Sequence, residues 1–237
     1  MSDRSSEIAP IGLLLSGGLD SCILLGHLLR QGRRVRPFYV ESGLAWQRGE
    51  LAAVKSVLRA LASPKLDPLV HLDLPLGDLY ADHWSVTGRE VPDAASADDA
   101  VYLPGRNALL TIKALLWCRL HGIDELALAV LQSNPFADAT DEFFDGFESA
   151  LGCATGGRVR IVRPLAGLDK QQVMELGRGL PLELTFSCIA PVDGHDCQQC
   201  YHCGQCNKCA ERMDAFRQIG VDDPTRYMGA VDNLRSL

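Results

Sequence analysis

The feature that most constrains this chain is a serine and glycine loop between an apolar run and a helical pattern. Residues 11–15 are short and continuously apolar, which is typical of a strand buried on both faces. The loop Ser16-Gly17-Gly18-Leu19-Asp20-Ser21 follows directly, and residues 22–30 carry apolar side chains at helical spacing. A buried strand, a glycine turn and a helix in this order predict the start of a βαβ unit in a parallel sheet.

The same loop predicts a phosphate site. Two adjacent glycines let backbone N–H groups approach an anion with no Cβ in the way, and a helix starting near Asp20 adds the positive end of its dipole. Ser16 and Ser21 add hydroxyl donors, whereas the Asp20 carboxylate repels phosphate and suits the Mg²⁺ that accompanies ATP. The spacing fits neither a Walker loop nor Gly-x-Gly-x-x-Gly. The alternative is a tight turn that holds no ligand.

Strand and helix patterns alternate along the rest of the chain. We expect strands at residues 35–40, 69–74, 126–131 and 159–162, and helices at 51–61, 106–120, from about 140, and at 170–177. The polar stretch 78–100 is expected to be a long loop over the edge or the active face of the sheet. The prediction is an α/β, Rossmann-like doubly wound parallel sheet whose ligand binds beyond the carboxyl ends of the strands. We place a nucleotide domain at 8–180 and a small C-terminal zinc-binding module with a helical tail at 181–237.

Six of the nine cysteines lie between residues 188 and 209, five of them at every third position. Cys-x-x-Cys pairs chelate Zn²⁺, and a cluster of this kind without a secretory signal indicates a metal site before disulfides. A redox dithiol is the alternative, because six thiols exceed the four that zinc uses. We expect His195 and His202 to be exposed. The isolated cysteines are expected to be small buried thiols: Cys22, Cys118 and Cys153.

Charge and hydropathy favour a small-molecule substrate. The formal net charge is −7, and proteins that bind nucleic acid directly usually carry a basic face. The longest apolar stretch, 108–120, is interrupted by Lys113 and Arg119, so we expect no membrane span. The apolar run 11–15 is too short for a signal peptide, and we expect a cytoplasmic protein.

Four segments together resemble one known family. They are Leu14 to Ser21; Leu103-Pro104-Gly105-Arg106-Asn107; Pro164-Leu165 with Asp169-Lys170; and residues 182–188 followed by Cys203, Cys206, Cys209 and Arg212. Over nearly its whole length the chain resembles the 7-cyano-7-deazaguanine synthase family, the QueC/ExsB branch of the PP-loop ATP-pyrophosphatases. Members convert 7-carboxy-7-deazaguanine, ammonia and ATP to the nitrile preQ0, a precursor of queuosine.

The resemblance implies a set of site residues. It implies ATP binding by Leu14, Leu15, Ser16, Gly17, Gly18, Leu19, Asp20, Ser21, Gly105 and Arg106, and catalytic roles for Asp20, Arg106 and Lys170. It further implies one structural Zn²⁺ per subunit on Cys188, Cys203, Cys206 and Cys209, and a homodimer. Cys197 and Cys200 then lie in an insertion, and a shifted ligand set that uses them is the alternative.

The chain departs from the family pattern at two places. Glu41 to Trp46 stand where members usually carry Asp-Tyr-Gly-Gln, and residues 132–138 replace the Tyr-Pro-Asp-Cys-Arg stretch that helps to shape the substrate pocket. One alternative is therefore a relative that adenylates a different carboxylate or attaches a deazaguanine to a macromolecule. Two further alternatives are a PP-loop tRNA-thiolation enzyme and a nucleotide-binding sensor without chemistry.

Overall fold

A five-stranded parallel sheet forms the centre of the protein. The computed structural model describes residues 9–131, 133–194 and 199–228. The strands lie side by side in the order β3-β2-β1-β4-β5, and every neighbouring pair is parallel. Their bounds are β1 (Ile11–Leu14), β2 (Val35–Glu41), β3 (Val70–Asp73), β4 (Glu125–Ala127) and β5 (Arg160–Val162). The predicted five strands and their parallel arrangement are confirmed.

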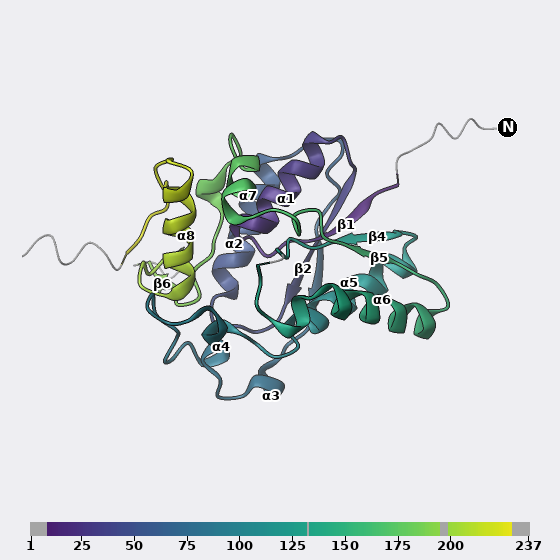
Figure 1. The fold of residues 1–237 in the computed structure, drawn as a ribbon, viewed down its shortest axis with the longest axis horizontal. Coiled ribbons are helices and arrows are strands. Elements are labelled where there is room, and N and C mark those ends of the chain that lie inside the picture. The colour runs from purple at the N-terminus through teal and green to yellow at the C-terminus, as the bar shows by residue number, and fades with distance from the viewer. Residues whose placement is uncertain (1–8, 132, 195–198, 229–237) are drawn as a thin grey trace, which may run out of the picture.

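Helices cover both faces of this sheet (Figure 1). On one face, α1 (Leu19–Arg30), α2 (Gln47–Ala60) and α7 (Lys170–Leu176) pack against the side chains of Leu13 and Tyr39. On the other face, α5 (Arg106–Leu120) and α6 (Asp141–Thr155) pack against Phe38. Phe38 and Tyr39 point to opposite faces because side chains alternate along a strand. The chain therefore has the expected doubly wound architecture.

Local sequence explains where several helices begin. Thr140 caps α6 by accepting a hydrogen bond from the Phe143 N–H at 3.1 Å. Asp169 and Gln172 form a reciprocal capping box at the start of α7, which fixes the backbone position of Lys170. Lys170 is therefore the first residue of a well-capped helix.

The expected fourth strand is shorter than the apolar run that predicted it. β4 ends at Ala127, and the backbone N–H of Leu128 still bonds to the Val162 carbonyl at 2.9 Å. Leu128, Ala129 and Val130 then line the cleft described below. The run is apolar because it passes from the sheet into a cleft wall, and the prediction of a strand up to residue 131 was wrong in its length.

Besides the sheet and its two helix layers, the protein has a region that contains elements from two distant parts of the sequence. The first part holds α3 (Gly77–Tyr80), α4 (Trp84–Thr87) and the 3-10 turn η1 (Asp98–Val101), so the expected long loop at 78–100 is partly helical. His83 caps α4 by accepting from the Ser85 N–H, a local signal with no long periodicity. The second part holds η3 (Leu182–Leu184), β6 (Val192–Asp193), β7 (Cys200–Tyr201) and the longer helix α8 (Asn207–Gln218). The turn η2 (Ala137–Ala139) lies elsewhere and packs with α5 and α6.

One apolar cluster joins these two parts. Trp46 and Leu103 pack in it together with Phe186, Cys188 and Ile189. Backbone bonds add to the contact, since the Asn207 N–H donates to the Pro92 carbonyl at 3.0 Å. Residues after 181 thus share a core with residues 44–103, and the division at 180/181 stays a prediction. Within the described ranges, no helix combines the length and apolar character needed to cross a bilayer.

Candidate functional site

A cleft of about 320 Å³ opens at the carboxyl ends of the central strands. The order of strands switches direction between β1 and β4, and this is the place where doubly wound sheets bind ligands. Nine of the eleven residues predicted to bind ATP or to act in catalysis line it: Leu14, Leu15, Ser16, Gly18, Leu19, Asp20, Ser21, Arg106 and Lys170. Gly17 and Gly105 each stand next in the chain to residues that line it.

The loop 16–21 is fixed by backbone contacts on both sides. Gly17 has a φ of +84°, and a Cβ at this position would lie 2.7 Å from the carbonyl oxygen of Glu50 on α2. On the other side, the Phe186 N–H donates to the Gly17 carbonyl at 2.8 Å. Gly18 is the N-cap of α1, so the helix begins at Leu19 as the sequence indicated. Only glycine fits at position 17, and the loop is held rigidly at the start of a helix.

Hydroxyl groups lie within the turn itself. The Ser16 and Ser21 Oγ atoms are 3.1 Å apart, and Ser21 Oγ donates to the Gly18 carbonyl at 3.2 Å. The first residues of α1 leave backbone N–H groups without helical partners at the same end of the helix as these hydroxyls. This arrangement can bind a phosphate group.

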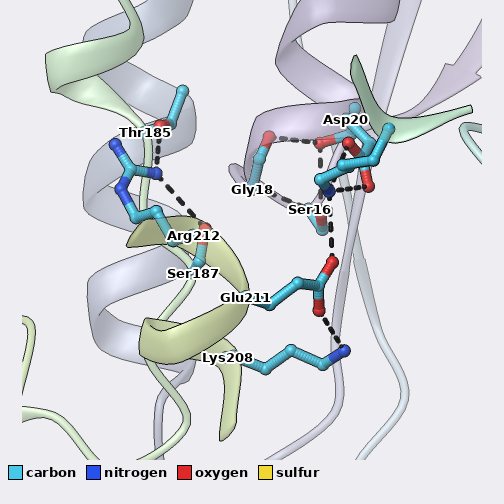
Figure 2. Close-up of polar contacts among 10 residues, drawn as sticks. Ser16, Gly18, Asp20, Thr185, Ser187, Lys208, Glu211 and Arg212 are labelled. Carbon is cyan, nitrogen blue, oxygen red and sulfur yellow. Dashed lines mark hydrogen bonds and ion pairs between the residues drawn. The ribbon is translucent and has the colours of Figure 1, made fainter. Parts of the chain in front are cut away.

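A chain of charged side chains extends from the loop across the cleft wall (Figure 2). Lys170 Nζ lies 2.9 and 3.0 Å from the two Asp20 carboxylate oxygens and 3.1 Å from Glu211 Oε1. The other Glu211 oxygen accepts from Lys208 Nζ at 2.6 Å. Lys170 is thus not a solvated surface lysine, and Asp20 is paired with an ammonium group at the position where a metal ion was expected.

Burial and charge oppose each other in this network. Burial favours the neutral amine of Lys170, yet the Asp20 and Glu211 carboxylates raise the pKa of Lys170 above its ordinary value. Burial also disfavours the charged form of Glu211, but the ammonium groups of Lys170 and Lys208 lower the pKa of its carboxyl to about 2. Lys170 and Glu211 therefore remain charged around neutral pH.

Arg106 and Glu50 line another part of the cleft wall. Gly105, with a φ of +74°, is the N-cap of α5 and places Arg106 in the first turn. The Arg106 guanidinium lies 5.8 Å from the ring centre of Trp46, and its Nε is buried without a hydrogen-bond partner among the described residues. Glu50 accepts from Trp46 Nε1 at 2.9 Å and from the Tyr39 hydroxyl at 3.3 Å. This wall offers an aromatic ring, a cation and a carboxyl group to a polar ligand.

The pKa of Glu50 differs strongly from that of a free glutamate. Burial raises the pKa of its carboxyl to about 7, against the opposing effect of the Arg106 charge and of the hydrogen bonds from Trp46 and Tyr39. Cleft residues with perturbed pKa values are candidates for functional groups. The sequence patterns did not identify Glu50 as a site residue. Its position four residues after Trp46 was the available signal, because residues at this spacing lie on one helix face and can contact each other.

Four cysteine sulfurs converge in the region that was predicted to bind zinc. The thiols of Cys188, Cys203, Cys206 and Cys209 all lie within 4.8 Å of one another, with 3.9 Å between Cys188 and Cys206 and between Cys203 and Cys209. Zn–S bonds of about 2.3 Å place tetrahedral sulfurs about 3.8 Å apart, so the sulfur positions suit this ion. Gly204, at a φ of +75°, forms the turn that lets the Gln205 and Cys206 N–H groups donate to Cys203 Sγ.

Two cysteines of the cluster remain besides this group of four. Cys200 lies apart, with its Sγ 3.1 Å from Arg48 Nε, and Cys197 lies outside the described residues. Hydrogen bonding to the Cys188 thiol lowers the pKa of Cys203 and Cys206, whereas the neighbouring thiols raise the pKa of Cys188. The described geometry favours the set of four over a set that includes Cys200.

Two expectations about burial were wrong. His202 is buried: its Nε2 accepts from the Ser187 N–H at 3.1 Å and its ring contacts Phe186. Burial lowers the pKa of His202 to about 4, which keeps the ring neutral. Cys153 is exposed on α6, because the residue lies on the solvent face of that helix, whereas Cys22 and Cys118 are buried as expected. His195 lies outside the described residues.

Arg212 on α8 connects the cysteine region to the loop 16–21. Its side chain is 1% exposed and donates to the hydroxyls of Thr185 and Ser187 (Figure 2). It also donates to the Leu182 carbonyl. The adjacent Phe186 N–H binds the Gly17 carbonyl, so the connection spans only a few residues. The sequence analysis did not identify Lys208 or Glu211 as cleft residues. Their spacing could have indicated them, because Lys208, Glu211 and Arg212 lie on the same helix face as the buried Ala215 and Phe216.

The fold and the cleft define an α/β protein of the doubly wound class with a glycine loop at its strand-order switch. The chain belongs to the QueC family, since the model described as "Queuosine biosynthesis protein QueC" matches residues 11–220. A 7-cyano-7-deazaguanine synthase of Anaeromyxobacter dehalogenans is 30% identical over 240 residues, which cover 96% of this chain and 99% of that protein. One of Novosphingobium aromaticivorans is 33% identical over 243 residues, with 96% and 99% covered.

A solved structure is also similar in shape. It is titled as a 4-thiouridine synthetase–RNA complex with bound ATP, and it matches with a TM-score of 0.49 and 20% identity over 90% of this chain and 50% of that chain. Similarity at this level does not establish a shared function.

Proposed function

We propose that this protein is an ATP-dependent ligase that converts 7-carboxy-7-deazaguanine and ammonia to 7-cyano-7-deazaguanine. The observation that carries the proposal is the meeting of Asp20, Arg106 and Lys170 in one cleft at the glycine loop, in a chain of the QueC family. Relatives of nearly the same length are named 7-cyano-7-deazaguanine synthase. Family membership also favours this reaction over tRNA thiolation.

The proposed chemistry activates a carboxylate twice. The substrate carboxylate attacks the α-phosphorus of ATP, pyrophosphate leaves, and an acyl adenylate forms. Ammonia displaces AMP and gives the amide. A second ATP adenylates the amide oxygen and releases a second pyrophosphate, and loss of AMP and of the two amide protons leaves the nitrile. Each adenylation converts an oxygen that leaves poorly into one that leaves readily, which is why ATP is split at the α-phosphorus.

Residues of the cleft have separate roles in this proposal. Backbone N–H groups and hydroxyls of the loop 16–21 bind the phosphates, and Arg106 and Lys170 stabilise the charge that develops on the leaving pyrophosphate. Asp20 would hold the Mg²⁺ that neutralises and orients the triphosphate. Lys170 then exchanges one of its carboxylate partners for a phosphate oxygen. The unpartnered Arg106 Nε is consistent with a ligand that completes its hydrogen bonding.

The cysteine module would hold one structural Zn²⁺ per subunit on Cys188, Cys203, Cys206 and Cys209. Four thiolates close the coordination sphere, so the ion stabilises the fold and leaves no position for substrate. A homodimer is part of the proposal on family grounds alone.

A second candidate is a related enzyme that adenylates a different carboxylate or attaches a deazaguanine to a macromolecule. Ser42, Leu44 and Trp46 line the cleft in the segment where the family usually carries Asp-Tyr-Gly-Gln. The segment 42–46 of the cleft wall thus has other side chains than those usual in the family, whereas the phosphate-binding loop 16–21 follows the family pattern.

The decisive experiment compares the wild type with the Asp20→Asn variant and measures how far each adenylates the substrate. The purified protein is incubated with ATP, ammonia and 7-carboxy-7-deazaguanine, and AMP and nitrile are followed by mass spectrometry alongside ATP/pyrophosphate exchange. We expect Asp20→Asn to lower exchange at least about a hundredfold, since it removes the charge that balances the metal and Lys170. Asp145→Asn, at an exposed position of α6, is the matched control. Full exchange by Asp20→Asn would refute the role of Asp20, and AMP release that ignores every carboxylate tested would refute the proposed reaction.

A further inference from the structure

Helix α8 brings a lysine from the cysteine module into the same cleft as the phosphate loop. Lys208 lines the cleft together with Ser16, Ser21 and Lys170, and its side chain is 33% exposed against 21% for Lys170. We propose that Lys208 is a second phosphate-binding lysine, so that the cysteine module supplies part of the ATP site. This inference rests on the proposed use of ATP, but not on the identity of the carboxylate.

The hydrogen bonds of the two lysines differ in a way that supports this role. An ammonium group has three N–H donors. All three donors of Lys170 have acceptors, namely both Asp20 oxygens and one Glu211 oxygen. Among the residues that the structure describes, Lys208 has one acceptor, the second Glu211 oxygen at 2.6 Å. Lys208 therefore retains two donors at the cleft wall, whereas Lys170 must give up a carboxylate to bind phosphate.

The local charge balance leads to the same conclusion. Asp20 and Glu211 are two carboxylates around the single ammonium group of Lys170, and this set of three repels an arriving triphosphate (Figure 2). Lys208 supplies the cation that brings the set to neutrality. Because Glu211 contacts both lysines through different oxygens, it holds the Lys208 ammonium on the side of the cleft where the phosphate loop lies.

The position of Lys208 in the sequence couples it to the cysteine cluster. Lys208 stands between Cys206, the N-cap of α8, and Cys209 in its first turn, and both cysteine sulfurs belong to the group of four. The backbone of this turn is anchored on its other side by the Asn207 N–H, which donates to the Pro92 carbonyl. The cluster thus sets where the lysine side chain leaves the helix. In this reading, the module presents a charged group to ATP in addition to stabilising the fold.

The test compares three ligands: ATP, which has the adenosine and the pyrophosphate part, and two ligands that have only one of these parts. Affinities of the full-length, zinc-loaded protein for ATP, inorganic pyrophosphate and AMP are measured by isothermal titration calorimetry for the wild type, Lys208→Met and Lys208→Arg. Lys55→Met, at an exposed position of α2, is the control. Zinc content and melting temperature are determined for each variant. Lys208→Gln, which keeps a polar group on the wall, replaces the methionine variant if that variant loses zinc.

We expect Lys208→Met to raise the Kd for ATP and pyrophosphate about tenfold, as one lost charge-assisted hydrogen bond implies, and to leave AMP within about twofold. Lys208→Arg and Lys55→Met should bind all three ligands as the wild type does. Unchanged ATP and pyrophosphate affinity in Lys208→Met would overturn this inference while leaving the proposed function intact, and equal weakening of AMP would show a structural role instead. A wild type that binds neither ATP nor pyrophosphate would overturn both.

Discussion

Replacing Glu50 by Gln should stabilise the protein at alkaline pH and not at acidic pH. Glu50 lines the cleft and is only partly exposed, and burial raises its pKa from 4.5 to about 7. Its two oxygens accept hydrogen bonds from Trp46 and Tyr39. A glutamine can keep both contacts, because its carbonyl oxygen can accept from Trp46 while its amide group donates to the Tyr39 oxygen.

The magnitude follows from the shift in pKa. Below about pH 4.5 the carboxyl is protonated in the folded and the unfolded chain, and its ionisation costs nothing. Between about pH 4.5 and 7 the unfolded chain loses this proton while the folded chain keeps it, so the free energy of unfolding falls as the pH rises. Above pH 7 the loss is complete and amounts to about 3 kcal/mol at 1.36 kcal/mol per pKa unit, which is an upper limit because water in the cleft reduces it.

The assay is urea unfolding of wild type and Glu50→Gln at about pH 5 and pH 8, with the midpoint and slope fitted for each. We expect the variant to be more stable by up to about 3 kcal/mol at pH 8 and nearly equal at pH 5. Glu183→Gln, at an exposed position, should show no such difference between the two pH values. The reasoning fails if the stability difference between wild type and Glu50→Gln is the same at both pH values, or if the variant is the less stable protein at pH 8.

Two further predictions concern the glycine loop and the cysteine cluster. Gly17→Ala should destabilise the fold by about 2–4 kcal/mol and weaken ATP binding, because its Cβ meets the Glu50 carbonyl in addition to the left-handed strain. Gly156→Ala, which has a φ of +66° and open space around it, should cost only about 1 kcal/mol in urea unfolding, and an equal cost for both variants would count against the clash. We expect elemental analysis to find one zinc per chain in the wild type and in Cys153→Ser, and to find it lost in Cys209→Ser. Zinc at full stoichiometry in Cys209→Ser would rule out the proposed ligand set.

Patterns within a few neighbouring residues were enough to predict the glycine loop, the sheet with its helices and the cysteine cluster. The loop 16–21 was identifiable because the strand before it, its glycines and the helix after it are contiguous, and each follows local rules of backbone geometry. The five strands and the pair of helix layers were identifiable from the alternation of short apolar runs with helical spacing. The spacing of the cysteines likewise indicated a cluster that the structure brings together.

Only the tertiary structure decided which charged groups meet in the cleft. Lys170 is separated from Asp20 by 150 positions and from Glu211 by 41, and no local pattern specifies such pairs. Glu50 and His202 have unusual pKa values because packing removes them from water, which depends on the neighbours that the fold provides. Local backbone preferences act over a few residues and can be read from the sequence, whereas burial and electrostatic pairing depend on distances that are fixed only when the elements pack together.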